Sequence, residues 1–471
     1  MPDLAAGRRN RGGERRGPAD PSRQAAYDLL RAVSDRDVYA NLTLPSLLRE
    51  RGLHGRDAAF ATELGYGTLR ASGTLDAILA AGVDRPLTEV DPDVIDVLRL
   101  GAYQLLRTRV PAHAAVSTTV DLAPRRSGGF VNAVLRRVTR RSWDEWVDAL
   151  APADPVGRLA LRYAHPGWVV SAFRDALGGD LAETAEALAA DDTRPETHLV
   201  ARPGRIDRDD LAAVSGGVAG PWSPYAVRLS GGGDPADLAA VRDGRAGVQD
   251  EGSQLCVRAL TLAGLEIPSR DRYWLDLCAG PGGKGGVLGA LAAQRTTDAS
   301  GPGGAGVPVR VLAVEINEYR ARMVAATTRA LPVMVIRADG TDPVWAPGAF
   351  DRVLVDAPCT GLGALRRRPE ARWRRQPTDV PQLTRLQRAL LGSGIAAARP
   401  GGVIAYVTCS PHLAETRAVV AEALRREPVE QIDARPLFPG VPDLGPGPYV
   451  QLWPHRHGTD AMFCALFRRV T

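Results

Sequence analysis

The spacing of hydrophobic residues divides the chain into a helical N-terminal region and a C-terminal region in which strands alternate with helices. Over residues 23–141, apolar positions recur every three or four residues, as at Ala26, Leu29, Leu30 and Val33. This spacing places apolar side chains on one face of a helix. Glycine and proline turn signals separate the segments, so the pattern predicts an all-α bundle over residues 23–141.

From residue 246 onward the pattern changes to short apolar runs separated by longer segments with helical spacing. Short runs of this kind are typical of parallel strands that are covered on both faces. The expected strands are residues 273–277, 309–314, 333–337, 350–355, 402–407 and 461–467. The alternation predicts an α/β fold for residues 246–471, with a doubly wound, Rossmann-like sheet.

The remaining segments differ from both regions. Residues 142–245 mix helical pieces with two strand-like segments, 198–201 and 225–229, and they predict a small α+β linker module that could also contact RNA. Residues 1–22 are rich in arginine, glycine and proline without a hydrophobic period, which is typical of a disordered basic tail. A low-complexity insert at residues 296–306 is expected to be mobile.

The composition of the 471 residues is that of an ordinary globular protein, with 45% hydrophobic and 24% charged residues. A net charge of +5 permits a nucleic-acid partner without requiring one. The five cysteines include no C-x-x-C pair, so we expect neither a disulfide framework nor a metal site, and free thiols indicate a cytoplasmic protein. The sequence has no run of about 18 apolar residues, so no membrane span is predicted.

A glycine-rich segment, GPGGKGG at residues 280–286, follows the first predicted strand of the α/β domain and precedes an apolar helix. A strand, glycine turn and helix in this order present backbone N–H groups to a ligand. Lys284 is the single lysine of a chain with 59 Lys and Arg residues, which indicates a role that arginine cannot fill, unless codon usage left it there by chance. The P-loop pattern fails because Gly285 follows the lysine, whereas a dinucleotide site remains open.

Three carboxylates, Asp276, Glu315 and Asp339, follow the ends of three successive predicted strands. The carboxyl ends of parallel strands share one edge of the sheet, so the three are expected to line one site. Glu315 would bind ribose hydroxyls, and Asp339 would accept a hydrogen bond from the adenine amine. A ligand with ribose, adenine and a cationic group suits this lining better than a pyrophosphate does, which favours S-adenosylmethionine. The alternative is that these carboxylates are helix caps and turn residues.

Cys359 and Cys409 come just after the fourth and fifth predicted strands, where α/β domains bind ligands. C5 of a pyrimidine is too weak a nucleophile to take a methyl group directly. A thiolate that adds to C6 makes C5 able to attack a sulfonium methyl, and a second group then removes the C5 proton so that the adduct eliminates. Asp356 is placed to hold a proton near N3, where negative charge develops. These residues favour the methylation of a pyrimidine.

At these residues the chain resembles a known family, the Sun/Fmu or NOL1/NOP2 RNA (cytosine-5) methyltransferases. The resemblance rests on segments of the α/β domain: VQDEGSQL (248–255), LDLCAGPGGK (275–284), DAPCTGLGALRRRPEARW (356–373), TCS (408–410) and DAMF (460–463). The helical region is similar to the RNA-binding domain related to the antitermination factor NusB, in segments at residues 63–70, 98–106, 111–123 and 130–137. This order of domains resembles the architecture of the family's 16S ribosomal RNA methyltransferases.

The resemblance implies S-adenosylmethionine as the cofactor and assigns roles to residues of the motifs. Cys409 is expected to form the covalent adduct with the base, and Cys359 to assist product release. Lys284 is expected to organise Asp356 beside the methyl donor, which makes both part of the catalytic group. The residues expected at the cofactor are Cys278, Ala279, Gly280, Pro281, Gly282, Gly283, Lys284, Glu315, Asp339 and Asp356.

The chain departs from the family pattern in the glycine loop and at the ribose-binding acid. Gly280 stands where the family commonly has alanine, and Gly285 and Gly286 replace a pair of threonines. Glu315 replaces the more usual aspartate. None of these changes removes a catalytic group, so they bear on the affinity for the cofactor rather than on the reaction.

Two arginine-rich segments, residues 125–142 and 366–375, each carry six arginines and are expected to contact RNA phosphates, with a solvated surface as the alternative. Trp373 would stack on an unpaired base. The residues predicted to bind RNA are Arg136, Arg137, Arg366, Arg367, Arg368 and Trp373. The target base must be flipped or single-stranded for a thiol to reach C6.

The sequence therefore favours a monomeric RNA (cytosine-5) methyltransferase that acts on 16S ribosomal RNA, with no metal and no membrane partner. One alternative is a NusB-like RNA-binding or ribosome-assembly protein with a vestigial catalytic half. The intact Cys359, Cys409, Asp356 and Lys284 argue against it. The other alternative is a nicotinamide oxidoreductase, in which the two thiols would have no role.

Overall fold

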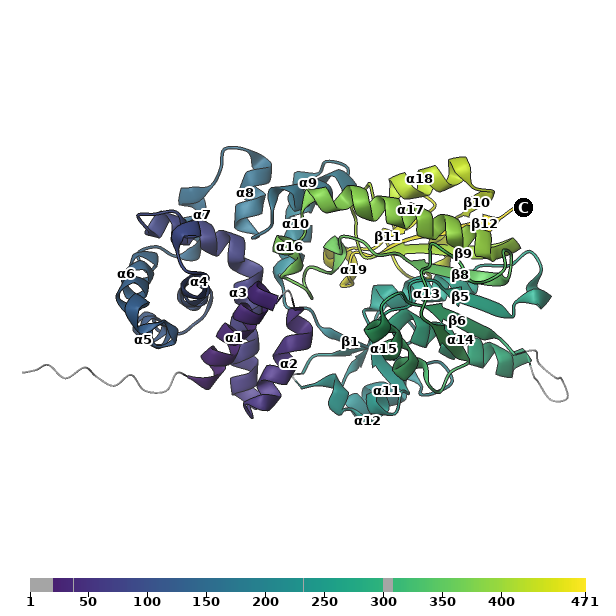
Figure 1. Ribbon diagram of the computed structural model, residues 1–471, viewed down its shortest axis with the longest axis horizontal. Coiled ribbons are helices and arrows are strands. Elements are labelled where there is room, and N and C mark those ends of the chain that lie inside the picture. Colours follow the sequence, from purple (N-terminus) through teal and green to yellow (C-terminus); the bar gives the residue numbers. More distant parts are fainter. Residues whose placement is uncertain (1–19, 37, 232, 300–307) are drawn as a thin grey trace, which may run out of the picture. The chain divides into compact units, whose positions relative to one another are not determined.

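The chain folds into two compact units, which meet in sequence between residues 150 and 151 (Figure 1). The computed structural model describes residues 20–36, 38–231, 233–299 and 308–471. Residues 1–19 of the predicted tail lie outside the described part, whereas residues 21 and 22 already belong to helix α1. Of the predicted insert, residues 300–306 lie outside the described part and residues 296–299 extend helix α14.

The first unit is all-helical, as predicted. Its α-helices are α1 (Pro21–Arg36), α2 (Ala40–Glu50), α3 (Gly55–Gly82), α4 (Pro92–Arg107), α5 (Ala112–Leu122), α6 (Gly128–Val138) and α7 (Trp143–Leu150). Apolar side chains such as Leu29, Leu98 and Leu135 form its core. A Cβ at Gly67 would lie 2.1 Å from the ring of Tyr103, so α3 can approach α4 this closely only with glycine at that position.

This helical unit extends beyond the predicted boundary at residue 141. Trp146 of α7 is buried in the core of the unit, and its indole N–H donates a hydrogen bond to the carbonyl oxygen of Val138 at 3.0 Å. The polar turn residues before α7 suggested a boundary there, but the apolar face of α7 packs back onto the bundle. The unit therefore ends at Leu150.

The second unit is built around one large mixed sheet with the strand order β10-β12-β9-β8-β5-β6-β7, and β11 pairs with β12 (Figure 1). Its strands are β5 (Tyr273–Asp276), β6 (Arg310–Val314), β7 (Val333–Ile336), β8 (Phe350–Asp356), β9 (Ala398–Thr408), β10 (Val429–Ile432), β11 (Val450–Gln451) and β12 (Phe463–Arg469). The pairs among β5 to β9 are parallel, and β12 runs antiparallel to β9. All six predicted strands are present; β10 and β11 were missed because both are short and partly polar.

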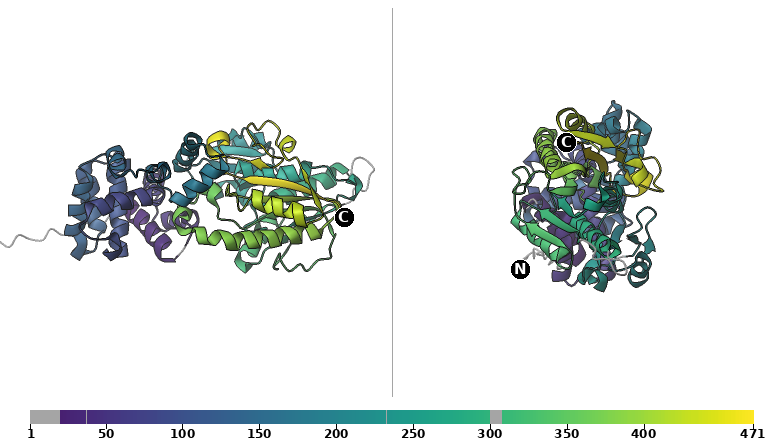
Figure 2. Two further views of the ribbon diagram at one scale, coloured as in Figure 1. Left: turned by 90° about the horizontal axis from the view of Figure 1, so that it is seen from above. Right: turned by 90° about the vertical axis from the view of Figure 1, so that its right-hand side faces the viewer.

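Helices cover both faces of this sheet, which confirms the predicted α/β class (Figure 2). Helices α13 (Glu251–Leu262) and α14 (Gly283–Ala299) pack into one hydrophobic cluster with the sheet. Helices α17 (Val380–Ala397) and α18 (Arg417–Arg426) contribute to a second cluster. Helix α15 (Glu318–Thr328) packs beside α14. The strand order reverses between β5 and β8, and such a reversal opens a ligand-binding crevice at the carboxyl ends of the strands.

The module predicted for residues 142–245 is not a compact unit of its own, because residues 151–245 belong to the same unit as the large sheet. Val200 packs in a hydrophobic cluster with the large sheet, and residues between 199 and 246 also form a small cluster of their own. This part of the chain contains α8 (Pro155–Arg162), α9 (Gly167–Ala176), α10 (Leu181–Asp192), α11 (Arg208–Ser215), α12 (Ala239–Arg242) and an antiparallel sheet of β1 (Thr197–Ala201), β2 (Val218–Ala219), β3 (Ala226–Leu229) and β4 (Ala246–Val248). Val170 and Phe173 of α9 pack with Leu362 and Trp453.

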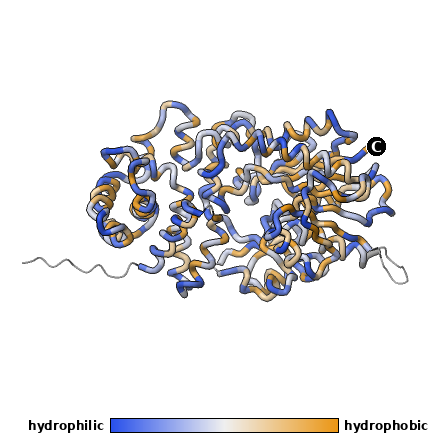
Figure 3. Tube along the Cα trace, in the orientation of Figure 1, coloured by the Kyte–Doolittle hydropathy of each residue, from blue (hydrophilic) through white to orange (hydrophobic). Residues whose placement is uncertain are grey.

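Hydrophobic residues concentrate in the strands of the large sheet (Figure 3). Trp274, Val353 and Ile404 are examples of buried side chains on its central strands. Among the described residues, no helix combines the length and the apolar character needed to cross a bilayer.

Candidate active site

The predicted site residues come together where the strand order of the large sheet reverses. Asp276 ends β5, Asp356 ends β8 and Thr408 ends β9. The parallel register pairs Asp356 with Val407, so the segments that carry Cys359 and Cys409 leave the sheet at the same level. The glycine loop leaves β5 at this same edge and leads into α14.

The glycine loop has a backbone conformation and close contacts that require glycine. Gly282 has a φ of 110°, in the region that favours glycine, and a Cβ there would lie 3.1 Å from the Val324 Cα. A Cβ at Gly280 would lie 2.2 Å from Oε2 of Glu315. The N–H of Gly280 instead donates a hydrogen bond to that oxygen at 3.1 Å. Gly280 and Glu315, the two departures from the family pattern at these positions, are therefore coupled. The longer Glu315 side chain occupies the space that a side chain at position 280 would need.

The three carboxylates at the strand ends have different environments. Glu315 is buried and is held by the N–H of Asn317 at 2.8 Å and by Arg320 at 3.0 Å. Asp276 is fully buried, neither of its oxygens makes a hydrogen bond of normal geometry to a described residue, and burial raises its pKa to about 7.

The third carboxylate, Asp339, is exposed and accepts hydrogen bonds from the backbone N–H of Thr341 at 2.8 Å and from its hydroxyl at 2.7 Å. These hydrogen bonds lower the pKa of Asp339. These contacts are those of a turn residue, which is the alternative that the sequence left open for Asp339.

Lys284 makes the contact that the sequence predicted. Its Nζ lies 2.8 Å from Oδ2 of Asp356, and its side chain is 12% exposed. Burial by itself lowers the pKa of the Lys284 ammonium, but the neighbouring Asp356 carboxylate offsets this effect and the pKa is raised overall. The ion pair therefore holds Lys284 charged and fixes the orientation of the Asp356 carboxyl between the glycine loop and the cysteines.

The two cysteines are in contact. The Sγ atoms of Cys359 and Cys409 lie 3.5 Å apart, and both residues are half-buried. The hydrogen bond between them lowers the pKa of Cys409, whereas the same contact together with burial raises the pKa of Cys359. Cys409 is thus the thiol that ionises more readily, as expected of a nucleophile, and Cys359 is the one that stays protonated.

Backbone contacts tie the cysteine segments to the closing motif of the chain. The N–H of Gly363 donates to the carbonyl oxygen of Cys409 at 2.8 Å, and the N–H of Ala461 donates to the carbonyl oxygen of Gly363 at 2.8 Å. A Cβ at Gly363 would lie 2.2 Å from the Ala461 oxygen. Segments that are far apart in the sequence therefore meet at Gly363, which the sequence analysis did not single out.

The arginine-rich segment 366–375 is not the single RNA-facing surface that the sequence predicted. The side chain of Arg366 is only 7% exposed, and it pairs with Asp250 at 3.2 Å and with Asp460 at 3.0 Å. Arg367 bridges the same two carboxylates at 2.8 Å and 2.9 Å. Their guanidinium groups brace the opening and closing motifs of the domain, which gives both arginines a structural role. That these two arginines contact RNA stays a prediction.

The other predicted RNA contacts remain on or near the surface. Arg368 is exposed and Trp373 is half-buried. In the helical unit, Arg136 is exposed and donates to the side chain of Asn132 at 3.2 Å. Arg137 donates to the carbonyl oxygen of Gly82 at 2.9 Å and also contacts Asp84, so part of its charge is already neutralised.

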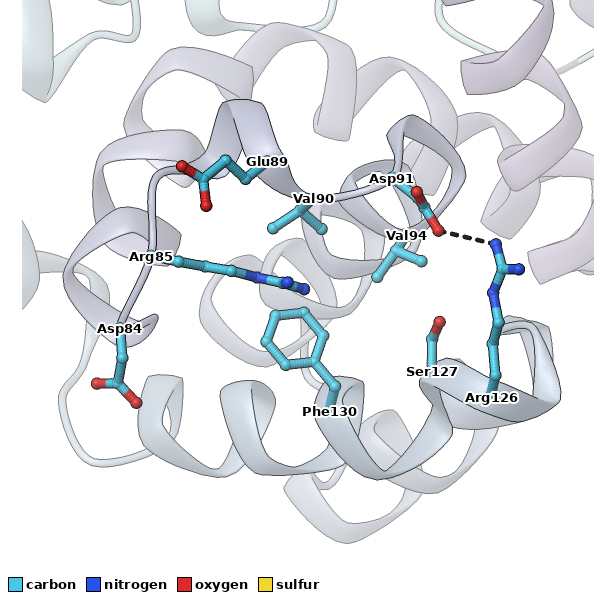
Figure 4. Close-up of a pocket in the computed structure, with 9 residues that line it drawn as sticks. All are labelled: Asp84, Arg85, Glu89, Val90, Asp91, Val94, Arg126, Ser127 and Phe130. Carbon is cyan, nitrogen blue, oxygen red and sulfur yellow. Dashed lines mark hydrogen bonds and ion pairs between the residues drawn. The ribbon is translucent and has the colours of Figure 1, made fainter.

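The helical unit also holds a cavity of about 600 Å³. Arg126 is paired with Asp91 at 2.9 Å, and the Arg85 guanidinium lies 5.0 Å from the centre of the Phe130 ring (Figure 4). The lining mixes acidic and basic groups and includes none of the predicted catalytic residues. This cavity is therefore separate from the chemistry of the cysteine pair.

A doubly wound sheet with a glycine loop, an acidic crevice and a reactive thiol pair defines a methyltransferase of the α/β class, here joined to a helical unit. The comparisons agree. The model of the 16S rRNA methyltransferase RsmB/F family matches residues 263–468, and the NusB family matches residues 20–140. The chain belongs to the RsmB/F family of methyltransferases, with an N-terminal NusB-family domain, which confirms the resemblance seen in the sequence.

Individual relatives match over nearly the whole chain. Rv1407 of Mycobacterium tuberculosis (strain H37Rv), whose name gives a methyltransferase without a substrate, is 57% identical over 98% of this chain and 99% of its own. The ribosomal RNA small subunit methyltransferase B of Klebsiella pneumoniae (strain 342) is 31% identical over 90% of this chain and 95% of its own. The crystal structure of PH0851 has a TM-score of 0.78 at 19% identity, covering 96% of this chain and 99% of that one, which supports the fold.

Proposed function

We propose that the protein is an S-adenosylmethionine-dependent RNA (cytosine-5) methyltransferase that modifies 16S ribosomal RNA through a covalent adduct. The observation that carries this proposal is the contact of Cys359 and Cys409 at 3.5 Å, beside the ion pair of Lys284 and Asp356. Two thiols and a carboxyl are the groups that methylation at C5 needs, and neither a nicotinamide oxidoreductase nor a pure RNA-binding protein has a use for them.

The residues at the crevice fit the cofactor. The buried Asp276 carboxyl makes no hydrogen bond of normal geometry to a described residue and lies against the glycine loop, where a Cβ at Gly285 would come within 3.0 Å of it. Residues 278–284 would hold the donor, and Glu315 would face its ribose. Asp339, which is exposed just after β7, would accept a hydrogen bond from the adenine amine. When bound, S-adenosylmethionine supplies an electrophilic methyl group, and an acidic lining favours its positive charge.

The reaction of the chain's own groups follows from their pKa values and positions. The Cys409 thiolate adds to C6 of the cytosine, and electron density moves to C5. The Asp356 carboxyl, held by Lys284, keeps a proton at N3 as negative charge develops there. Once Cys409 is bonded to C6, it no longer carries the charge that raises the pKa of Cys359, so Cys359 can ionise and accept the C5 proton after methylation. The bond between Cys409 and C6 then breaks and the product leaves.

The 16S target and the RNA partner are inferred from the family and from the names of relatives such as the Klebsiella protein. The direct test incubates the purified protein with 16S transcript and methyl-labelled donor, then maps 5-methylcytosine by bisulfite sequencing. We expect one labelled cytosine position, which is absent from the ribosomal RNA of a strain that lacks the protein. Label on adenine or guanine, or label retained by a Cys409→Ala protein, would overturn the proposal.

A further inference from the structure

A buried carboxylate, Glu415, lies between the two cysteine segments. It is fully buried in the stretch between β9 and α18. One of its oxygens accepts the backbone N–H of Thr360 at 2.8 Å, and the other accepts the Ser410 hydroxyl at 2.7 Å. Thr360 directly follows Cys359, and Ser410 directly follows Cys409. One side chain therefore binds the neighbours of both thiols.

A carboxylate matches the donors around this position. The Thr360 hydroxyl and the Gln387 side-chain amide also donate to Glu415, the latter at 3.0 Å. A carboxylate is the side chain that accepts hydrogen bonds with both of its terminal oxygens. Hydrogen bonds to an ionised group are stronger than those between neutral groups. The Gln387 amide also donates to the carbonyl oxygen of Pro358 at 2.8 Å, which extends the same network to the residue before Cys359.

The sheet alone does not determine where the two thiols lie. The parallel ladder ends with Asp356 opposite Val407, so Cys359 sits in a loop beyond the last paired residue of β8. Gly361, two residues after Cys359, has a left-handed φ of 76°, which turns the chain sharply. Beside the backbone hydrogen bond from Gly363 to the carbonyl oxygen of Cys409, the loop around Cys359 is held by side-chain contacts, and those contacts converge on Glu415.

We propose that Glu415 is a positioning residue that holds the Cys359 and Cys409 loops together and thereby keeps the two thiols in contact for adduct formation and release. This inference rests on the proposed cytosine-5 methyl transfer for its catalytic consequence, but the thiol contact itself can be measured without RNA. Glu415 touches neither reacting sulfur through a hydrogen bond; it acts through Thr360 and Ser410.

The charge of Glu415 adds to this geometric role. The Cys409 contact and burial raise the pKa of Cys359, and the Glu415 carboxylate adds to the rise. The pKa of Cys409 is lowered instead. Removing the Glu415 charge should therefore lower the pKa of Cys359 and make the two thiols more alike, a change that a purely structural brace would not produce.

The first experiment measures the thiol contact in the full-length protein with phenylarsine oxide, which bridges neighbouring thiols. We expect the wild-type protein to bind one equivalent, and Cys359→Ala to abolish binding. Because preorganisation controls such two-point binding, Glu415→Ala should weaken it by about tenfold. Glu415→Gln keeps the shape of the side chain and part of the hydrogen-bond network, so its affinity for the arsenical should lie between those of the wild type and Glu415→Ala. Unchanged binding in both Glu415 variants, or no binding to the wild type, would overturn the inference.

The second experiment measures methyl transfer to 16S transcript. Since a displacement of about 1 Å costs on the order of 10²-fold in rate, Glu415→Gln should lower kcat by at least about tenfold while KM for RNA and donor stays within about threefold. Thr360→Val removes one hydrogen-bond donor to Glu415. The double variant with Glu415→Gln should lose less kcat than the sum of the losses in the two single variants. Asp351→Asn is the matched control: this buried carboxylate accepts the N–H groups of Arg272 and Tyr273 at the opposite end of β8, and its loss should leave kcat of folded protein unchanged.

The two experiments separate the two claims. If the wild type methylates no cytosine, the proposed function fails, whereas the arsenical titration still decides whether Glu415 sets the thiol contact. If the wild type methylates cytosine and Glu415→Gln has wild-type kcat and wild-type arsenical binding, the role of Glu415 is wrong and the proposed function stands.

Discussion

The methyl-donor side and the base-acceptor side of the site are held in place in different ways. On the donor side, the backbone of the glycine loop determines most of the geometry, because Gly280 and Gly282 leave no room for a Cβ. Lys284 adds one ion pair. On the acceptor side, Cys359 and Cys409 lie on two loops that are joined by buried polar side chains from distant parts of the chain. The difference shows that the donor side can be recognised from one short glycine motif, whereas the acceptor side is assembled from two loops that only the fold brings together.

The largest effect is expected for the nucleophile on the acceptor side. Cys409→Ala should lower methyl transfer by a factor on the order of 10³ or more, because no other group can form the bond to C6. Incorporation of labelled methyl groups into 16S transcript measures this effect. Cys256→Ala is the control, since that buried cysteine lies on α13 and packs in the hydrophobic core, so the variant should retain activity. Substantial turnover by the Cys409 variant would remove it as the nucleophile.

The second prediction concerns Cys359, which should act after Cys409. Cys359→Ala should still form the bond to C6 but release the product slowly, so a protein–RNA adduct that survives denaturant should accumulate. A denaturing gel with labelled RNA measures it, and Cys359→Ala combined with Cys409→Ala should show no adduct. An active Cys359 variant without an adduct would assign release to another group.

The third prediction contrasts arginines that looked equivalent in the sequence. Arg366→Ala leaves Asp250 and Asp460 buried with one partner fewer, so the free energy of unfolding should fall by about 3 kcal/mol. Arg136→Ala on the exposed face of α6 should change it by less than about 0.5 kcal/mol. Urea unfolding measures both. Equal effects would mean that the buried arginine network does not brace the domain.

The contrast between donor and acceptor sides also explains what the sequence could predict. The strands, the glycine loop and the positions of Cys359 and Cys409 at strand ends follow from local hydrophobic patterns and short motifs. The contact of Lys284 with Asp356 was predictable because the glycine loop that leads to Lys284 follows β5, and Asp356 ends the adjacent strand β8. The pairing of Arg366 with Asp250 and Asp460 was not, since 116 and 94 residues separate the partners and no local pattern marks an arginine as buried. Nor does any local pattern mark Glu415 as the carboxylate that joins the two cysteine loops.

A smaller effect tests the donor side. Gly280→Ala places a Cβ against Glu315, so the affinity for S-adenosylmethionine should fall by about tenfold. Glu315→Asp in the same protein shortens the acid and should restore most of the affinity, which isothermal titration calorimetry would show. If the double variant binds no better than Gly280→Ala alone, the two positions are not coupled.

The smallest effect is a shift in the pH profile of the thiol pair. The pKa of Cys409 is lowered chiefly by the hydrogen bond from Cys359, so its thiolate should appear at lower pH than that of an ordinary cysteine. Cys359→Ala removes that donor, and the alkylation of Cys409 by iodoacetamide should then require a higher pH. Peptide mass spectrometry follows the reaction at Cys409. A profile that moves to lower pH would contradict the assigned direction.

The central claim is that Cys409 forms the covalent bond to the RNA base, and one measurement tests it most directly. The Cys359→Ala protein is incubated with 16S transcript and S-adenosylmethionine, digested with nuclease and protease, and analysed by peptide mass spectrometry. The account predicts a methylated cytosine nucleotide attached to the peptide that contains Cys409. A nucleotide attached to another residue, or no attached nucleotide in a protein that still methylates RNA, would contradict it.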